Sequence, residues 1–500
     1  MSSSLFMGLD FGTQGVRCGI FDKYGEVKAT SESNYETFFP EAGWAEQAPN
    51  DWISAMGDAV AMCYAQTGEE VFAQIKALAV CSTSSTVIAV DENNKPLANA
   101  ILWMDNRAKT EAAKINDTQH KILNYCGREV SVEWFIPKLL WIKENWTGVY
   151  DKAKRIVEQQ DYINHYLTGR WCASISQSTC KGNYVEELGG YSEEFMARIG
   201  LPDYREKINL DVLKQAEAIG KLRGSIAEAY KIPEDVTVYQ GGIDAHTCMI
   251  GLGVCKPGDM GAVLGTSFVH LAVVDKPLFK EGIWGPYKDA IIPDLFCMEG
   301  GQVSAGSITK WFLEEFDVNG SNPYQIMENE ADRIPIGSEG LVLLDYFQGN
   351  RTPYKDPMAK GVIYGLTLRH SKAHIYRAIL EGIAFGMRNI IDNMETADFS
   401  IDVIRGCGGV TKNPLWLQII SDVTGKPIML TQHSSNSGVL GCAIISAVGS
   451  ASYHNFEEAV DAMVQCTDTV YPDKDAHNKY NPNYKKYLKL YDNLKELMSE

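Results

Sequence analysis

The feature of this sequence that most constrains its fold is a short motif that occurs twice, about half a chain apart. Residues 5–21 predict two apolar strands joined by a turn that contains Gly12-Thr13. Residues 261–271 repeat this order of strand, turn and strand around Gly265-Thr266. A motif repeated at this distance predicts that each half of the chain forms a similar unit. With 500 residues, the chain is also too long for one hydrophobic core, so two domains are expected.

The tips of the two predicted hairpins indicate a phosphate site. Each tip presents backbone N–H groups and small hydroxyl groups, which together can cradle a phosphate. Asp10 lies beside the first tip, so a cation would have to separate its carboxylate from a bound phosphate, and Mg²⁺ suits such oxygen ligands. Two tips that face each other could hold one nucleoside triphosphate from both sides. Taken alone, however, a Gly-Thr tip favours a plain hairpin turn.

Composition excludes several classes of partner. The net charge of −18 makes nucleic acids and anionic membrane surfaces poor partners, because like charges repel. No run approaches the ~20 apolar residues of a membrane span, and residues 1–5 lack the basic region of a signal peptide. The 12 cysteines include no Cys-x-x-Cys pair, which argues against a zinc site and a disulfide framework. We therefore expect a cytoplasmic protein with reduced thiols.

A single carboxylate near the middle of the chain is the first candidate for a catalytic group. Val236-Thr237-Val238 predicts a buried strand, Gly241-Gly242 predicts a tight turn, and Asp244 follows. A rigid strand end can aim such a carboxylate as a general base. Taken alone, the segment favours a simpler interpretation, in which Asp244 is the N-cap of a helix.

Polar residues at the ends of other predicted strands indicate a ligand that carries several hydroxyl groups. Ser82–Thr86 follows an apolar run, and the predicted strand 101–107 ends with Trp103, Asp105 and Arg107. In such a site an aromatic face covers C–H groups while charged side chains bind hydroxyls. A buried ion pair between Asp105 and Arg107 explains the same pattern equally well.

Lys181 is a further candidate ligand of substrate oxygen. It lies in the polar segment 176–182, which we do not expect in the core, and an exposed lysine is the default interpretation. Two amphipathic helices are expected from their periodicity, at 136–145 and 372–394.

The second half of the chain predicts a glycine-rich loop between a strand and a helix. Val403-Ile404 predicts the strand, Arg405–Gly409 the loop, and Asn413-Pro414 the start of the helix in the favoured order of cap and first residue. Closely spaced glycines let a flat ring approach the backbone, so this loop is the candidate adenine site. A glycine-rich connection without a ligand is a common alternative. Residues 437–448 predict a helix of small residues that could pack under the loop.

In combination, these motifs resemble the FGGY carbohydrate kinases. Four segments occur in the order seen in that family: Asp10–Thr13, Gly241–Asp244, Gly265–Ser267 and Gly406–Gly409. Two longer segments are similar to the N-terminal and C-terminal signatures of the family: Trp134–Trp141, and Gly361–Leu366 together with Ala378–Glu381. The resemblance extends over nearly the whole chain. It implies an α/β fold with two ribonuclease-H-like domains of the actin and sugar-kinase clan, which flank a catalytic cleft.

The resemblance also implies a division of labour and a set of site residues. Residues 1–246 would bind the sugar and carry the catalytic Asp244, and residues 247–500 would bind ATP. Substrate contacts are implied for Ser84, Trp103, Asp105, Arg107, Glu133, Lys181, Asp244, Ala245 and Glu299. Nucleotide contacts are implied for Gly12, Thr13, Gln14, Arg17, Gly265, Thr266, Ser267, Gly306, Gly408, Gly409 and Asn413, with Mg²⁺ at Asp10.

Within the family, several segments look most like ribulokinases, including the D-ribulokinase branch. These segments are Ser131–Glu133, Lys181, Asp244–His246, Trp284–Tyr287 and Glu299–Gln302. Glycerol kinases carry Arg-Glu where this chain has Thr83-Ser84 and Gln where it has Ala245, and the Gln-Met-His-Gly segment of xylulokinases is missing near Ser82. Asn436 replaces a glutamate of many relatives, so its role stays open.

The resemblance implies an ATP-dependent kinase that phosphorylates a primary hydroxyl of a ketose, with a ribulose-type pentulose as the first candidate. Xylulose, erythrulose, erythritol and glycerol-like substrates are alternatives within the same class. An actin-like nucleotide switch that binds a partner protein and no sugar is the alternative from another class. The expected partners are therefore a small sugar and ATP, and a homodimer is left open.

Overall fold

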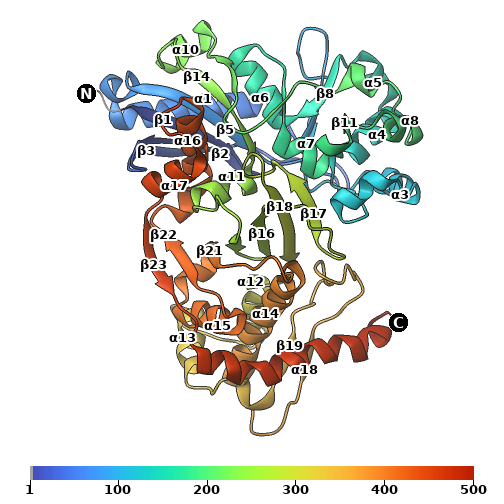
Figure 1. Cartoon of the computed structure of the whole chain (residues 1–500), viewed down its shortest axis with the longest axis vertical. Helices are drawn as coiled ribbons and strands as arrows, with labels where there is room; N and C mark the ends of the chain where they lie inside the picture. The colour runs from blue at the N-terminus through green and yellow to red at the C-terminus, as the bar shows by residue number, and fades with distance from the viewer. Residues whose placement is uncertain (1–3, 500) are drawn as a thin grey trace.

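The computed structural model describes residues 4–499 and contains two large sheets, one in each half of the molecule (Figure 1). The strands of the first sheet are β1 (Leu5–Phe11), β2 (Gly15–Asp22), β3 (Val27–Asn34), β5 (Ile75–Ser82), β13 (Ala218–Lys221) and β14 (Thr237–Ile243). The strands of the second sheet are β15 (Asp259–Leu264), β16 (Phe268–Val274), β17 (Trp284–Lys288), β18 (Phe296–Gln302), β21 (Val403–Cys407), β22 (Ile428–Thr431) and β23 (Cys466–Val470).

The two sheets pair their strands in the same way, which confirms the predicted repeat. In the first sheet β1, β2 and β3 form an antiparallel meander, and β5 and then β14 add in parallel beside β1. In the second sheet β15, β16 and β18 form the meander, and β21 and then β22 add in parallel beside β15. An antiparallel strand follows at the far edge of each, β13 and β23 respectively. The predicted α/β fold with two domains of one topology is therefore confirmed.

Both predicted hairpins are present, with their tips at the positions expected. In the first hairpin Asp10 pairs with Arg17 across β1 and β2, and the tip is closed by a hydrogen bond of 3.0 Å from the Gly12 N–H to the Gly15 carbonyl. In the second hairpin the Gly265 N–H donates to the Ser267 carbonyl at 3.2 Å.

Helices and short strands complete the two halves. The first half holds α1 (Pro49–Thr67), α2 (Glu69–Phe72), α3 (Lys109–Asp117), α4 (Phe135–Asn145), α5 (Thr147–Lys152), α6 (Gln159–Thr168), α7 (Ile175–Lys181), α8 (Glu193–Arg198), α9 (Tyr204–Lys207) and α10 (Gly224–Tyr230). The second half holds α12 (Gly306–Glu315), α13 (Pro323–Asp332), α14 (Lys372–Met394), α15 (Pro414–Thr424), α17 (Phe456–Met463) and α18 (Lys474–Met498). The smaller sheets are formed by β4 (Glu46–Gln47), β6 (Val87–Val90), β7 (Ala100–Ile101) and β8 (Arg155–Glu158), by β9 (Ala173–Ser174) with β12 (Val212–Leu213), by β10 (Tyr184–Val185) with β11 (Gly190–Tyr191), and by β19 (Val342–Leu344) with β20 (Val362–Tyr364). Among residues 4–499, no helix has the length and hydropathy that a membrane span requires.

The two halves meet along two helices, α11 (Asp244–Gly251) and α16 (Ser437–Gly449). These helices approach each other so closely that a Cβ on Gly441 would lie 2.0 Å from the Thr247 carbonyl oxygen. A Cβ on Gly8 of β1 would lie 2.2 Å from the Val439 carbonyl oxygen. The expectation that residues 437–448 pack under the glycine-rich loop is therefore wrong, because small residues let this helix pack on β1, β5 and α11 instead.

The predicted domain boundary lies between residues 246 and 247, which is inside α11. The helix continues through this point without a break, so one element connects the two halves. The division into residues 1–246 and 247–500 stays a prediction.

Several local expectations about the first half are wrong. Gly241 and Gly242 continue β14 instead of forming a turn, because a Cβ on Gly241 would lie 2.1 Å from the Val80 carbonyl oxygen of the neighbouring strand. Residues 103–107 form a loop after the short strand β7. Segment 176–182 is largely buried as α7, because internal partners satisfy polar groups in it, such as the Thr179 hydroxyl, which donates to the Ile175 carbonyl at 3.0 Å.

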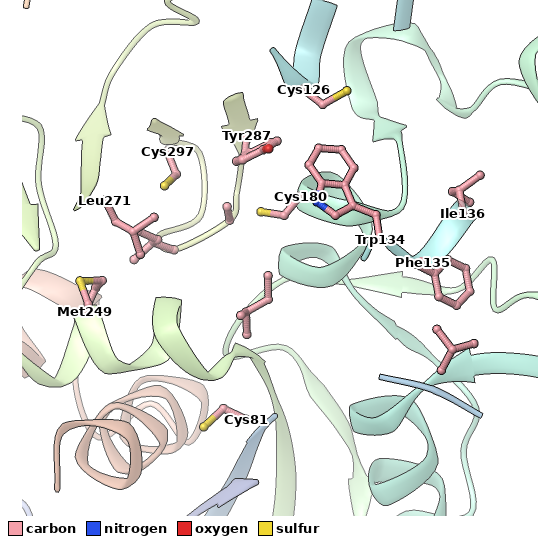
Figure 2. Packing of buried hydrophobic residues seen from close by; sticks show 14 of the residues in the cluster. Cys81, Cys126, Trp134, Phe135, Ile136, Cys180, Met249, Leu271, Tyr287 and Cys297 are labelled. Carbon is pink, nitrogen blue, oxygen red and sulfur yellow. The ribbon is translucent and has the colours of Figure 1, made fainter. Parts of the chain in front are cut away.

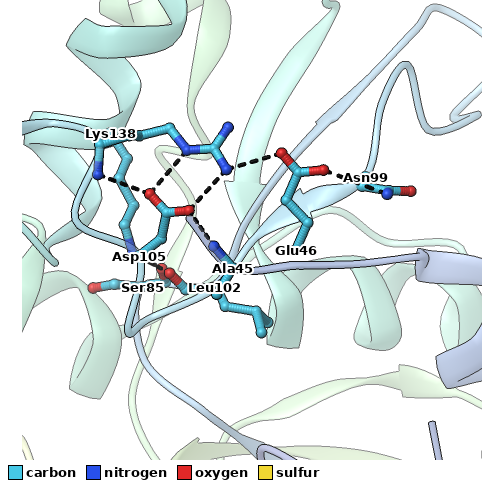
Figure 3. Close-up of polar contacts among 8 residues, drawn as sticks. Ala45, Glu46, Ser85, Asn99, Leu102, Asp105 and Lys138 are labelled. Carbon is cyan, nitrogen blue, oxygen red and sulfur yellow. Dashed lines mark hydrogen bonds and ion pairs between the residues drawn. The ribbon is translucent and has the colours of Figure 1, made fainter. Parts of the chain in front are cut away.

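A buried cluster of charges fixes the loops that follow β5 and β7 (Figure 3). The guanidinium of Arg107 donates to both carboxylate oxygens of Asp105, at 2.8 and 2.7 Å, and to Glu46 at 2.8 Å. The side chains of Asp105 and Arg107 are fully buried. The ion pair that the sequence left as an alternative is therefore what the structure shows, and the substrate contacts implied for these two residues stay a prediction.

Lys138 of α4 completes this cluster. Its ammonium group donates to the carbonyl oxygens of Ser85 and Leu102, at 2.8 and 2.6 Å. Burial lowers the pKa of Lys138 to about 7, although the charges of Asp105 and Glu158 act in the opposite direction. Lys138 thus ties the polar segment after β5 to the loop after β7.

We predict that Lys138→Met destabilises the protein. The change leaves the Ser85 and Leu102 carbonyl oxygens without their ammonium partner, which costs about 1–3 kcal/mol for each group left unpaired. Urea unfolding followed by circular dichroism measures this loss. Lys143→Met is the matched control, because Lys143 lies on the same helix but forms a partly exposed ion pair with Asp203, whose loss costs about 0–1 kcal/mol. Equal stability of the two variants would contradict the role of Lys138.

Candidate active site

Asp10 and Asp244 lie at the same edge of the first sheet. Asp10 is near the end of β1, and Asp244 directly follows β14 as the first residue of α11. Both strands run parallel to β5, which lies between them, so their carboxyl ends meet. Asp10 is buried and Asp244 is half-buried.

The position of Asp244 in its helix differs from the N-cap interpretation. The N-cap residue is Ile243, and the Asp244 carboxylate accepts a hydrogen bond of 2.6 Å from the N–H of the adjacent residue Ala245. A carboxylate at the N-cap would instead accept from an N–H two or three residues further along. The second carboxylate oxygen of Asp244 has no partner among the hydrogen bonds of the described residues, and a general-base role for Asp244 stays a prediction.

Burial raises the pKa of both carboxyl groups. Burial raises the pKa of Asp244 to about 7, and the negative charge of Asp10 raises it further, while the Ala245 N–H and Arg17 lower it. Burial also raises the pKa of Asp10, although the Cys81 thiol donates to it at 3.3 Å. Arg17 is half-exposed and lies 3.5 Å from Glu32. A carboxyl group whose pKa is near 7 is suited to accept a proton at neutral pH.

A polar cluster with aromatic neighbours lies near His246 of α11. The Lys181 ammonium of α7 lies 3.2 Å from the Glu299 carboxylate of β18, so the pair joins the two halves. The side chain of Lys181 is only 13% exposed, so the default of an exposed lysine is wrong. Its ammonium lies 4.9 Å from the centre of the Trp134 ring and 5.0 Å from that of Trp284. Figure 2 shows Trp134 and Tyr287 near Cys180, the residue before Lys181.

The charged groups of this cluster shift one another's pKa. Burial alone would raise the pKa of Glu299, but the nearby charges of Lys181 and Arg351 lower it below its ordinary value. Burial lowers the pKa of His246 to about 4, so this imidazole is neutral at pH 7. His246 lies 3.1 Å from the Ser176 hydroxyl, which in turn accepts a hydrogen bond from the Ile243 N–H at the start of α11. This chain of contacts fixes the backbone that carries Asp244.

The remaining residues that the sequence predicted as substrate contacts lie in different surroundings. Trp103 is 39% exposed, and its indole N–H donates to the Thr13 hydroxyl at 3.0 Å, so it touches the first hairpin tip. The Ser84 hydroxyl is buried and has no hydrogen-bond partner among the described residues. Glu133 is half-buried directly before Trp134, and Ala245 is half-buried directly after Asp244.

A cavity of about 820 Å³ lies in the second half, beside the second hairpin tip. Residues predicted to bind nucleotide that line it are Gly265, Thr266, Gly306, Gly409 and Asn413. Ser267 and Gly408 are not in its lining. Gly408 has a φ of +102°, and a Cβ there would lie 2.5 Å from the Leu264 carbonyl oxygen, so this turn requires glycine. A Cβ on Gly409 would meet nothing within 4 Å, which leaves room for a flat ring.

The residues at the first tip fit a phosphate and a cation. Gly12, Thr13 and Gln14 form the turn itself, and Gln14 and Arg17 are exposed beside it. Mg²⁺ in nucleotide sites is typically held by one or two carboxylates together with phosphate oxygens. Asp10 and Asp244 offer such carboxylates, and burial raises the pKa of each.

Sequence reasoning missed several residues of these sites. The rings of Trp134, Trp284 and Tyr287 surround Lys181, but they are far from it in the chain and no spacing links them to it. Tyr35 was also missed, and its hydroxyl donates to the carbonyls of Gly12 and Gly15 and so holds the first tip in place. A lysine that is buried and has no acidic residue next to it in the sequence indicates aromatic partners only weakly.

Comparisons with known proteins agree with this arrangement. Residues 5–251 match the model of the N-terminal domain of the FGGY family of carbohydrate kinases, and residues 260–450 match that of its C-terminal domain. An FGGY carbohydrate kinase domain-containing protein of Xenopus laevis is 32% identical over 98% of this chain and 97% of the relative. A ribulokinase of Halalkalibacterium halodurans is 28% identical over 98% of this chain and 95% of the relative. The crystal structure of a xyloylose kinase from Brucella ovis superposes with a TM-score of 0.90 at 25% identity, over 99% of this chain and 100% of that one.

We predict that Asp10→Asn lowers the pKa of Asp244. In the wild type this pKa is about 7, and removal of the Asp10 charge removes one of the two causes that raise it. Nuclear magnetic resonance titration of ¹³C-labelled aspartate carboxyl groups, without nucleotide or Mg²⁺, measures the shift. Because burial is the larger cause, the value in the variant should remain above that of an exposed aspartate. An unchanged titration would show that the two carboxyl groups do not interact.

Proposed function

Because the chain belongs to the FGGY family of carbohydrate kinases, which transfer a phosphoryl group to an alcohol, we propose that it phosphorylates a primary hydroxyl of a ketose with ATP. A ribulose-type pentulose is the substrate class we favour. The observation that carries the proposal is the position of Asp244, which lies at the same sheet edge as Asp10 and two residues before His246, an imidazole near the charges of Glu299 and Lys181. The family match favours kinase activity over the alternative of a nucleotide switch that binds no sugar.

In this proposal the first half, residues 1–246, binds the sugar and the second half, residues 247–500, binds the nucleotide. The cavity beside the second tip has the size and the bare glycine backbone that an adenosine group needs. Thr13 and Thr266 carry hydroxyl groups at the two tips, where they would hold phosphate oxygens, and Arg17 would add a positive charge at the first tip. When bound, Mg²⁺ at Asp10 would neutralise charge on the phosphates.

Asp244 has the central role in the proposed chemistry. Its carboxylate would accept the proton of the sugar hydroxyl as that oxygen attacks the phosphorus. The raised pKa strengthens it as a base, and α11 holds it by the contacts of Ala245 and His246. Closure of the two halves would exclude water, which otherwise competes with the sugar as nucleophile.

The cluster around Lys181 and Glu299 suits a small polyhydroxylated substrate. The ammonium of Lys181 and the carboxylate of Glu299 can donate to and accept from hydroxyl groups, and the rings of Trp134 and Trp284 limit the space. Similarity to proteins named ribulokinase favours a pentulose over other ketoses. Structural neighbours named xylulose kinase and glycerol kinase keep other sugars and polyols as alternatives.

We predict that Asp244→Asn lowers kcat by about 100-fold or more while the fold is retained, because the amide cannot accept the proton. A coupled assay of ADP formation measures the rate, and circular dichroism checks the fold. Asp235→Asn is the control, since Asp235 is an exposed aspartate just before the same strand. Near-normal turnover of Asp244→Asn would remove Asp244 from the role of base.

We predict that ATP consumption depends on added sugar and is most efficient with a ribulose. The panel consists of the stereoisomers of ribulose and xylulose, erythrulose, erythritol and glycerol, each compared by kcat/KM. A higher value for a tetrulose or a polyol would contradict the proposed substrate class and leave the kinase assignment intact. ATP consumption at the same rate with and without every sugar would contradict the proposal itself.

A further inference from the structure

A further cavity, of about 530 Å³, is lined by both halves of the chain. The first half contributes residues of the short helix η1 (Lys121–Cys126) and residues 127–129. The second half contributes residues 279–282 and Lys355. None of the residues proposed above to bind sugar, nucleotide or Mg²⁺ belongs to this lining. The proposed kinase chemistry therefore leaves the cavity without a function.

The cavity borders the aromatic cluster around Lys181. The centre of the Trp284 ring lies 5.0 Å from the Lys181 ammonium, and a Cβ on Gly127 would lie 2.9 Å from the same ring. Cys126, the last residue of η1, lies near Tyr287 of this cluster (Figure 2). Trp284 thus contacts both the cluster and a segment that lines the cavity.

The lining of the cavity carries an excess of positive charge. Its basic side chains are those of Lys121, Arg128, Lys280 and Lys355, and its acidic side chains are those of Glu129 and Glu281. Four basic and two acidic groups leave two positive charges in excess, in a protein whose net charge is −18. A local excess of this kind favours an anionic ligand.

Two of these cations have no ion-pair partner among the described residues. Lys355 is half-buried, and its ammonium donates to the Gly127 carbonyl of the other half. Burial lowers the pKa of Lys355, although the charges of Glu129 and Glu281 act in the opposite direction. The Arg128 side chain lines the cavity from the opposite wall and forms no hydrogen bond or ion pair with a described residue. A bound anion would supply the partner that both cations lack.

The backbone at both cations adopts an unusual conformation. Arg128 has a φ of +74° and Lys355 a φ of +51°, in the left-handed region that residues with a side chain rarely adopt. Backbone strain of this kind is concentrated at binding and catalytic sites. Two such residues on opposite walls of one cavity indicate a binding site.

The size and the aromatic lining of the cavity narrow the class of ligand. Phe279 is 52% exposed, and its ring lies edge-on to that of Tyr125, with the ring centres 5.1 Å apart. Both rings line the cavity beside the cations, and aromatic rings can cover the C–H groups of a small ligand. A phosphate group attached to an organic molecule has a charge of about −1.5 to −2 at pH 7, which matches the positive excess. A guanidinium binds phosphate oxygens in pairs.

We propose that this cavity is a second binding site, which takes the phosphate ester of a small sugar. Arg128 and Lys355 would bind the phosphate from opposite walls, so the ligand would link the two halves of the chain. Release of product requires the halves to separate, and a bound ester would therefore lower kcat. This effect on turnover rests on the proposed function, whereas binding of the ester does not. The ester is either the product of the proposed kinase reaction or another sugar phosphate.

Isothermal titration calorimetry of the full chain tests the binding. Ribulose 5-phosphate, glucose 6-phosphate and inorganic phosphate are the probes, each titrated without nucleotide and with saturating ribulose, which fills the proposed sugar site. Arg128→Gln should raise the Kd of the best ester by about tenfold, the effect of one lost charge-assisted hydrogen bond, and Arg128→Glu should abolish binding. Lys276→Gln is the matched control, because Lys276 is exposed and lies outside the lining.

Each outcome of the titrations decides a point. An ester that binds more tightly than inorganic phosphate supports the proposal, and the ester that binds best identifies the source of the ligand. Inorganic phosphate that binds as tightly as both esters would overturn the ligand class. Absence of binding, or the same Kd in the wild type and both Arg128 variants, would overturn the site. Circular dichroism checks that the variants are folded.

Turnover separates this site from the proposed sugar site. With saturating ribulose and ATP, the best ester should lower kcat in the wild type and leave kcat of Arg128→Gln unchanged, while KM for ribulose stays the same in both. A raised KM for ribulose in the variant would place Arg128 in the sugar site and overturn the proposal of a second site. A protein that phosphorylates no sugar would refute the proposed function, and the titrations would still decide whether the second site exists.

Discussion

Asp10 and Asp244 repel each other, and the fold holds them together in surroundings that are poorly hydrated. Burial raises the pKa of both carboxyl groups, and the charge of Asp10 contributes to the pKa of about 7 at Asp244. Two like charges at one site are unfavourable unless a cation or a proton is shared between them. The closeness of two poorly hydrated carboxyl groups lowers the stability of the free protein. The same closeness favours a bound cation and makes Asp244 a stronger base. The remaining features of the site follow from where these two acids lie.

The duplicated sheet places a hairpin tip at the corresponding position of each half. In each sheet the hairpin joins the central strand to its antiparallel neighbour, with Gly12 and Thr13 at one tip and Gly265 and Thr266 at the other. The helices α11 and α16 pack between the halves through glycines that allow backbone contact, as at Gly441 and Thr247. Lys181 and Glu299 add an ion pair across the same seam. Substrate binding and nucleotide binding would then both act through one junction.

The sequence predicted features that depend on local pattern and missed those that depend on packing. The hairpins, the long helix α14 and the cap at Asn413 follow from periodicity, glycine placement and capping chemistry within a few residues. The two glycines before Asp244 were predicted as a turn because close approach of β5 to β14 has no local signal. For Asp105 and Arg107 the sequence could not choose between a sugar site and an ion pair, because both use the same residue types, and the structure shows the ion pair. The aromatic walls around Lys181 come from distant segments that only the fold brings together.

The central claim is that one carboxylate, placed between a sugar pocket and two phosphate-binding tips, accepts the proton during phosphoryl transfer. A crystal structure with ribulose, Mg²⁺ and a non-hydrolysable ATP analogue tests it most directly. The account predicts that the terminal phosphate lies between residues 12–14 and 265–267, with the terminal hydroxyl of the sugar within hydrogen-bond reach of Asp244. A sugar hydroxyl that points away from Asp244, or a phosphate held elsewhere on the chain, would contradict it.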